Sequence, residues 1–380
     1  MTGAYRCWAE VDLDAMRENL AWLRHRVGPG VMILTVVKAD AYGHGLKPIA
    51  ALLMQSGTDI FGVANLAEAE AIRSVGQGWP ILILGPCLPG EVARAVEDDI
   101  MPTISSLEEA KLFSAAATKL GRVARVHVKV DTGMGRLGVA PGQAIELIER
   151  VQGLPGLRLE GLCTHFAAAE DDAAFTRQQV RRFRGLLGEL EGAGIRVALI
   201  HASNSAALLH QPDTRFNIVR PGLLVYGVAP PGRRRLDRLF QRRLRPALSW
   251  KCRVGLVKTV PKGTSLSYGR GFITPRAMRV ATITAGYGDG YLRAGSNRAR
   301  VLIHGHFCRI LGRITMDQMI VDVSRLERVE AGDEVVLIGQ QGRHAISATT
   351  LAGWCGTIPW EILTSIAYRV PRVYRGGSAA

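Results

Sequence analysis

The chain has 380 residues, of which 47% are hydrophobic and 21% charged, and its formal net charge is +15 at pH 7. This length predicts roughly two domains, and the composition is typical of a soluble globular α/β enzyme. The charge favours nucleic-acid binding only weakly, because the basic residues are spread along the chain without a recognisable reading motif.

The N-terminal segment MTGAYRCWAEVDLD carries acidic residues where a signal peptide would need an apolar core. No apolar run approaches the roughly 18 residues of a membrane-spanning helix. The six cysteines are scattered without a CxxC pair or a metal-ligand spacing. We therefore expect a cytoplasmic protein with reduced thiols, without a metal site and without membrane or nucleic-acid partners.

Eight short apolar runs follow between residues 31 and 226, and they are nearly continuous rather than alternating with polar residues. Such runs predict strands that are buried on both faces, as in a parallel sheet. The expected strands are 31–37, 60–64, 81–84, 100–104, 124–130, 157–162, 197–201 and 216–220.

The segments between these runs carry apolar residues at helical spacing, as in LAEAEAIRSV and QQVRRFRGLLGELE. Eight strand–helix units in succession predict a (β/α)8 barrel, which we place at residues 12–243. An open, doubly wound sheet is the alternative, but the number and even spacing of the strands favour closure.

After residue 245 the pattern changes to strands joined by Gly, Pro and Asp turns, with little helix until the end. This change predicts a separate, mostly-β domain over residues 244–380. A connection rich in arginine, which includes Arg233, Arg234, Arg235, Arg242 and Arg243, precedes it. The expected strands lie in LSWKCRVGLVKTV, MRVATIT, RVLIHG, MIVDV and DEVVLIG.

Polar side chains directly follow several of the barrel strands. Catalytic groups of a (β/α)8 barrel lie in the loops at the C-terminal ends of its strands. We therefore expect these side chains to meet at one mouth of the barrel. They are Lys38, Lys129, Asp131, Arg136, Thr164, His165, His201, Asn204, Ser205 and Arg220.

Lys38 leaves an apolar strand, and a partly desolvated lysine is suited to covalent attachment of a carbonyl cofactor. The loops after strands seven and eight are the usual phosphate site of this fold, and they hold Asn204, Ser205 and Gly222. A reactive lysine beside a phosphate site points to pyridoxal phosphate. No GxGxxG or GxxxxGK[ST] fingerprint follows a strand, which disfavours nucleotide cofactors.

Eight motifs in collinear order resemble the alanine racemase family of fold-type III pyridoxal-phosphate enzymes, from about residue 5 to residue 374. The resemblance implies a barrel followed by a β-domain, with residues 1–11 joining the β-domain. It also implies a homodimer in which the β-domain completes the partner's active site. The motifs are VVKADAYGHG, VKVDTGMGRLG, HASNSAA, NIVRPGLLVYG, SYGRGF, AGYGDGY, GRITMDQMIVDV and SIAYRVPRVY.

The same resemblance implies a role for each matching residue. Lys38 would hold the cofactor and act as one base, and Tyr268 of the partner subunit would act as the base on the opposite face. Arg220 would face the pyridine nitrogen. Tyr42, Ser205, Gly222 and Tyr368 would bind the phosphate, with Asn204 nearby, His165 beside the ring and His201 behind it. Arg136 and Met316 would contact the substrate, and Tyr287 and Arg293 would lie toward the entrance.

Some residues keep more than one interpretation. Lys129 is carbamylated in many family members, but unmodified it would equally serve as an ion-pair partner of Asp131. Taken singly, His165 and His201 are typical of structural histidines. Two residues depart from the family pattern. Thr315 stands where Cys or Ser is common, and Trp360 stands where Tyr is common; both lie in segments that are near the substrate in the family.

The function that the resemblance implies is interconversion of L- and D-alanine by a two-base mechanism. A serine or broad-specificity racemase of the same fold is the main alternative. A decarboxylase would carry an acidic residue in place of Arg220 and a cysteine motif in its β-domain. A non-catalytic pyridoxal-phosphate-binding protein would resemble only the first 220 or so residues.

Overall fold

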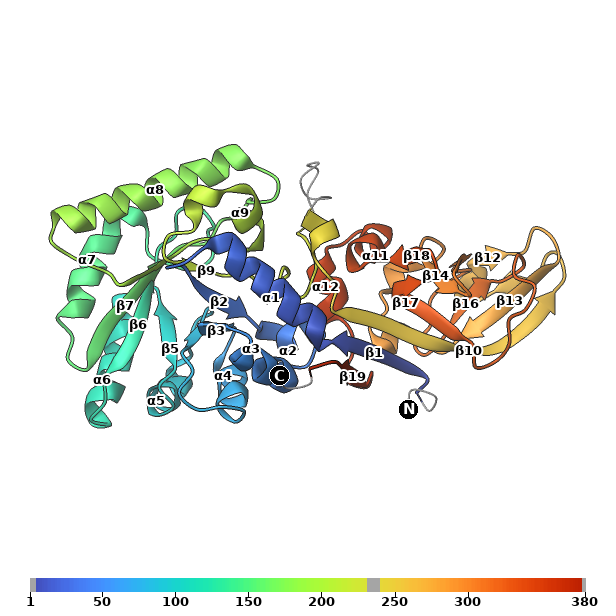
Figure 1. Cartoon of the computed structure of the whole chain (residues 1–380), viewed down its shortest axis with the longest axis horizontal. Helices are drawn as coiled ribbons and strands as arrows, with labels where there is room; N and C mark the ends of the chain where they lie inside the picture. The colour runs from blue at the N-terminus through green and yellow to red at the C-terminus, as the bar shows by residue number, and fades with distance from the viewer. Residues whose placement is uncertain (1–4, 231–239, 378–380) are drawn as a thin grey trace.

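The computed structural model describes residues 5–230 and 240–377, and in this part of the chain eight parallel strands close into a barrel (Figure 1). The last strand pairs with the first, with Met32 opposite Ile218 and Ile33 opposite Val219. The predicted barrel is therefore confirmed and the open sheet is excluded. Its strands are β2 (Met32–Val36), β3 (Ile60–Val63), β4 (Ile81–Ile83), β5 (Met101–Ile104), β6 (Ala124–Lys129), β7 (Leu157–Cys163), β8 (Leu199–His201) and β9 (Ile218–Val219).

Helices surround this barrel (Figure 1). The residues that they bury are mostly apolar, such as Leu20 of the first helix, Leu53 of the third and Phe183 of the longest. Several begin at a residue whose side chain accepts a backbone N–H of the first turn, such as Asn65, Ser106 and Asp172. The helices are α1 (Leu13–Val27), α2 (Lys38–Gly43), α3 (Leu46–Gln55), α4 (Leu66–Arg73), α5 (Val92–Glu97), α6 (Leu107–Lys119), α7 (Pro141–Gln152), α8 (Ala173–Gly192) and α9 (Ser205–His210).

Residues beyond 247 form the predicted mostly-β domain, which extends to one side of the barrel (Figure 1). Its longest strand, β10 (Leu248–Val260), has the bounds of the apolar run from which it was predicted. The other strands are β11 (Ser265–Leu266), β12 (Phe272–Ile273), β13 (Met278–Ile283), β14 (Arg300–Ile303), β15 (His306–Arg309), β16 (Met319–Asp322), β17 (Glu334–Gln341) and β18 (His344–Ile346). Two helices, α11 (Ala348–Cys355) and α12 (Pro359–Thr364), follow them.

Both ends of the described chain lie in the nine-stranded sheet of the β-domain. Strand β1 (Cys7–Asp12) pairs antiparallel with β10 and parallel with β19 (Arg372–Arg375). The first strand therefore precedes the barrel in sequence but belongs to the β-sheet in space. The domain boundaries themselves, 12–243 and 244–380, stay a prediction. Arg233, Arg234 and Arg235 of the expected connection lie outside the described residues.

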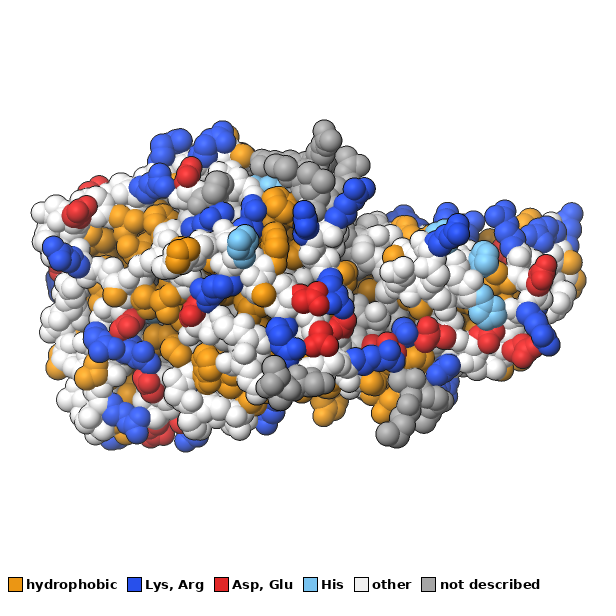
Figure 2. Space-filling view, viewed as in Figure 1, with side chains coloured by type: hydrophobic (Ala, Val, Ile, Leu, Met, Phe, Trp, Pro, Cys, Tyr) orange, Lys and Arg blue, Asp and Glu red, His pale blue; other side chains and the backbone are white. Residues whose placement is uncertain are grey.

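The charged side chains are dispersed on the face of the molecule that Figure 2 shows. Lysine and arginine occur over both the barrel and the β-domain, with acidic side chains between them. Within residues 5–230 and 240–377, no helix combines the length and the apolar character that crossing a membrane requires.

Candidate active site

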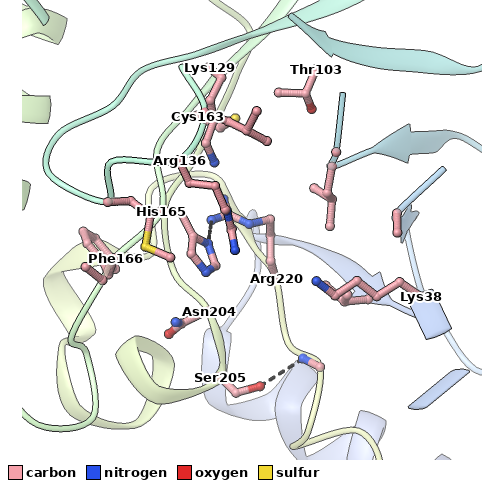
Figure 3. A pocket seen from close by; sticks show the side chains of 18 of the residues that line it. Lys38, Thr103, Lys129, Arg136, Cys163, His165, Phe166, Asn204, Ser205 and Arg220 are labelled. Atoms are coloured by element: carbon pink, nitrogen blue, oxygen red, sulfur yellow. Dashed lines mark hydrogen bonds between the residues drawn. The ribbon is translucent and has the colours of Figure 1, made fainter. Parts of the chain in front are cut away.

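A cavity of about 550 Å³ opens at the C-terminal ends of the barrel strands. It brings together side chains from loops that are far apart in sequence, and Figure 3 shows them converging from several strands. Of the residues predicted for the site, nine line this cavity. They are Lys38, Tyr42, Lys129, Arg136, His165, Asn204, Ser205, Arg220 and Gly222.

Lys38 lies two residues beyond the end of strand β2 and reaches into the cavity (Figure 3). Burial lowers the pKa of its amine, and the nearby positive charge of Arg136 lowers it further, while Glu68 opposes these effects. A lowered pKa increases the fraction of neutral amine near pH 7, which is the form that acts as a nucleophile or base.

The four residues after Lys38 form a left-handed turn, with φ between 52° and 54° at Ala39, Asp40, Ala41 and Tyr42. For L-amino acids this conformation costs about 1–2 kcal/mol per residue. Hydrogen bonds hold the turn in place. The Leu46 N–H donates to Asp40 Oδ1 (2.7 Å), and the Ala39 N–H donates to Glu68 Oε1 of helix α4 (2.7 Å). The turn places the Tyr42 side chain in the lining of the same cavity as Lys38.

Tyr42 meets Gly222 at the end of the cavity where the phosphate was predicted to bind. A Cβ atom on Gly222 would lie 2.5 Å from the Tyr42 hydroxyl, so only glycine allows this approach. The Gly222 N–H donates to Ser205 Oγ at 2.9 Å (Figure 3), which leaves the serine hydroxyl free to donate elsewhere. Asn204 also lines the cavity, but its Oδ1 accepts the Ala207 N–H and begins helix α9.

Arg220 lies fully inside the barrel mouth and is held on several sides. Its guanidinium donates to His201 Nδ1 (2.7 Å), to His165 Nδ1 (3.1 Å, Figure 3) and to the backbone carbonyls of Thr164 and Ala202. Burial and the positive charge of Arg220 lower the pKa of both histidines well below 6.5, which keeps them neutral. His201 lies behind Arg220, outside the lining of the cavity.

Lys129 ends strand β6, Arg136 lies in the loop that follows, and both line the same side of the cavity (Figure 3). Asp131 organises this loop by accepting the backbone N–H groups of residues 133–135. Burial lowers the pKa of Lys129 to about 8, with further contributions from Arg220 and Arg136. The structure thus places a readily deprotonated lysine beside two arginines.

Four other predicted residues lie outside this cavity, exposed on the β-domain. Their loops are hydrogen-bonded to one another: Ser267 to Arg313, Gly288 to Met316, and Arg369 to Asp289 and Asp317. The four residues are Tyr268, Tyr287, Met316 and Tyr368, whose side chains are 71%, 43%, 54% and 101% exposed. Arg293 is also exposed.

Tyr368 requires a correction, because its fully exposed side chain is not brought to the phosphate end of the cavity. Trp360 lies there instead: it lines the cavity and its side chain interacts with the Tyr42 hydroxyl. From the sequence, Trp360 was only a departure from the family pattern, without a role. Thr103, Cys163 and Glu170 also line the cavity and were not among the predicted site residues. Thr103 and Cys163 lie at the ends of strands β5 and β7, so the strand-end rule would have found them.

Comparisons with known proteins agree with this arrangement. Residues 11–230 match the family model "Alanine racemase, N-terminal domain" and residues 247–374 match "Alanine racemase, C-terminal domain". The chain is 42% identical to the alanine racemase of Symbiobacterium thermophilum, over 100% of both chains. It is 41% identical to that of Halothermothrix orenii, over 97% of this chain and 96% of the relative.

Solved structures show the same likeness. The structure of alanine racemase from Streptomyces lavendulae matches with a TM-score of 0.91 and 38% identity, covering 98% of this chain and 97% of that one. The structure from Bacillus anthracis, described with bound L-Ala-P, matches with a TM-score of 0.90 and 35% identity over 98% and 96% of the two chains. On these matches, and with the barrel, the β-domain and the cavity between the strand ends, the chain belongs to the alanine racemase family.

Proposed function

We propose that this chain is a pyridoxal-phosphate-dependent alanine racemase. The observation that carries the proposal is one cavity that holds both a half-buried lysine of lowered pKa and a glycine-lined cradle. The lysine would bind the cofactor covalently, and the cradle would take its phosphate. The whole-chain likeness to alanine racemases favours alanine over serine as the preferred substrate.

The residues of the cavity fit pyridoxal phosphate in charge and in shape. Gly222 leaves open the space beside Tyr42 and Ser205, whose hydroxyls would donate to the phosphate. The indole N–H of Trp360 donates to the Tyr42 hydroxyl and so would hold it in place at that end. Arg220 would face the pyridine nitrogen and His165 would lie beside the ring. When bound, the cofactor would withdraw electrons from Cα of the substrate and so weaken its C–H bond.

A racemase has to remove the Cα proton on one face of the substrate and return a proton on the other. Lys38 Nζ supplies one face, since it lies in the cavity and its pKa is lowered. Tyr268 would supply the opposite face from the partner subunit of a homodimer. The exposure of Tyr268, Tyr287 and Met316 supports this arrangement, because connected apolar side chains on a surface are typical of an interface.

Arg136 and Met316 would position the substrate, Arg136 by pairing with its carboxylate and Met316 from the partner subunit. Tyr287 and Arg293 would line the approach. The positive charges of Arg136 and Arg220 in the cavity would attract both the cofactor phosphate and the substrate carboxylate. A cytoplasmic location remains a prediction from the sequence.

We also propose that Lys129 is a carbamylation site. Its buried amine has a pKa lowered to about 8, so about a tenth of it is neutral at pH 7 and able to attack CO2. The nitrogen would form a bond to the carbon of CO2 and lose a proton to solvent. The resulting anion would pair with Arg136 and fix the orientation of that side chain.

The test compares Lys38→Ala with Lys47→Ala, because Lys47 is an exposed lysine on helix α3 outside the cavity. After reduction with borohydride, peptide mapping should place the cofactor on Lys38. D-alanine formation from L-alanine should fall by about a hundredfold or more in Lys38→Ala and stay unchanged in Lys47→Ala. Labelling of another lysine, or full activity in Lys38→Ala, would refute the proposal. A panel of L-amino acids would establish the substrate range.

A further inference from the structure

A second cavity, of about 290 Å³, lies where the barrel meets the β-domain. Its walls come from the turn after α2, from the segment after β9, and from β10, β17 and α11. It is distinct from the active-site cavity, because the two share no lining residue. It therefore requires an explanation separate from racemisation.

The walls of this junction cavity are mainly apolar, with Leu248, Ile338, Ile346 and Leu363 among them. Among the described residues that line it, none is an aspartate, glutamate, lysine or arginine. A charged ligand would lose its hydration here without gaining an opposite charge. The lining thus selects an uncharged, mostly apolar molecule.

His44 is one of the polar residues that line the cavity. It is completely buried, and its Nδ1 lies 2.9 Å from the carbonyl oxygen of Tyr42. A carbonyl only accepts hydrogen bonds, so Nδ1 carries the proton and Nε2 presents a lone pair. Burial lowers the pKa of His44 to about 4, which keeps the ring neutral.

Nε2 of His44 has no hydrogen-bond partner among the described residues. Two other polar groups of the lining are already engaged: the Tyr226 hydroxyl donates to the Val36 carbonyl (3.0 Å), and the Gln241 amide bonds to Ala229 and Gly227. A buried acceptor without a partner costs free energy, and a donor in the cavity would remove this cost.

We propose that the junction cavity binds a small, uncharged, mostly apolar molecule whose hydroxyl or N–H group donates a hydrogen bond to His44 Nε2. The size of the cavity suits a single substituted ring, since a dry cavity of about 150 Å³ already accepts benzene. A phenol or an indole has the required shape and the required donor.

The test uses p-cresol and p-xylene, which have nearly the same shape and differ in one hydroxyl group. Their dissociation constants are measured by ligand-detected NMR on the cofactor-loaded protein, so that the active-site cavity is filled. In His44→Phe the new ring keeps the packing on Tyr226, whose centroid lies 4.6 Å from that of His44, but lacks the acceptor. The preference for p-cresol over p-xylene should fall about five- to tenfold in this variant.

A second variant keeps the test decisive if His44→Phe does not fold. Ala348 also lines the cavity and is buried at the start of α11, so Ala348→Leu fills part of the cavity while leaving His44 and the active site in place. Both probes should then bind about tenfold more weakly or not at all. Absence of binding to the unmodified protein, unchanged binding in Ala348→Leu, or an unchanged preference in His44→Phe would each overturn the proposal.

Discussion

Arg220 Nη1 lies 2.7 Å from Nδ1 of His201, and Nε2 of His201 lies 2.9 Å from Nδ1 of His127. Arginine only donates, so Nδ1 of His201 must accept, and the proton of this neutral ring lies on Nε2. That N–H then donates to His127. The arginine therefore determines the tautomer of both histidines, and they in turn support its position inside the barrel.

The first prediction concerns this hydrogen-bonded series of Arg220, His201 and His127. Replacing His201 by Phe removes the acceptor of Arg220 and the donor of His127, both of which are buried. We expect the free energy of unfolding in urea to fall by about 2–4 kcal/mol, because two buried polar groups lose a partner. His306→Phe is the control, since His306 is exposed on β15, and it should change stability by less than about 0.5 kcal/mol. Equal effects of the two substitutions would contradict the prediction.

The second prediction is a loss of stability in mild acid. Burial lowers the folded-state pKa of His44 to about 4 and of His127 to about 3, and that of His201 lies well below 6.5. Unfolded histidines titrate near 6.5, so between that pH and about 4 the unfolded state binds more protons. The free energy of unfolding should therefore fall steeply as the pH drops below 6.5. The fall should be shallower in His201→Phe, and identical slopes would count against this account.

The third prediction tests the phosphate cradle. A methyl group on Gly222 would lie 2.5 Å from the Tyr42 hydroxyl, whereas one on Gly142 of helix α7 would meet nothing within 4 Å. We expect Gly222→Ala to weaken binding of pyridoxal phosphate at least about tenfold, because the hydroxyl must move from the site that would take the phosphate. Gly142→Ala should leave binding unchanged. Equilibrium titration followed by cofactor absorbance measures both, and equal affinities would refute the cradle.

The sequence predicts the barrel well, because each strand is an apolar run of its own and the closure follows from their number and spacing. It also predicts Lys38, Lys129 and Arg220, because side chains at strand ends must point to one mouth. It predicts less about the path of the loops. Nothing in Ala39–Tyr42 signals a left-handed turn, since none of these residues is glycine; the conformation is maintained by bonds to distant residues.

Tyr368 and Trp360 illustrate the same limit. They are eight positions apart in one helical and loop segment, and either aromatic side chain suits a phosphate site. Which of them faces the cavity depends on how helix α12 packs against the turn at Tyr42, a contact between segments more than 300 residues apart. A sequence pattern describes one segment and does not include this packing.

The fourth prediction concerns Lys129. Under 13C-labelled CO2, the protein should show a carbamate carbon resonance in NMR that is absent from Lys129→Met and present in Lys47→Met. Because the pKa of Lys129 is lowered to about 8, its neutral fraction, and with it the signal at a fixed concentration of dissolved CO2, should grow between pH 6 and 8. A signal that persists in Lys129→Met would assign the modification elsewhere, and no signal at all would leave Lys129 as an ordinary cation beside Arg136.

The last prediction is that each active site is shared between two subunits. Tyr268 is 71% exposed and lies outside the cavity that holds Lys38 of the same chain. A base must approach to about 3 Å of the proton that it moves, so Tyr268 can serve only a cavity in another copy of the chain. In a two-fold dimer the contact is reciprocal, which gives two composite sites.

Mixing two inactive variants tests this directly. Lys38→Ala lacks the first base and Tyr268→Phe lacks the second, and each homodimer has two defective sites. A heterodimer contains one site with both defects and one with both bases intact, so exchange of subunits should restore about half of the unmodified activity per heterodimer. Lys38→Ala mixed with itself under the same conditions should stay inactive. If heterodimers form, as native mass spectrometry would show, and activity does not return, both bases belong to one chain or Tyr268 is not a base.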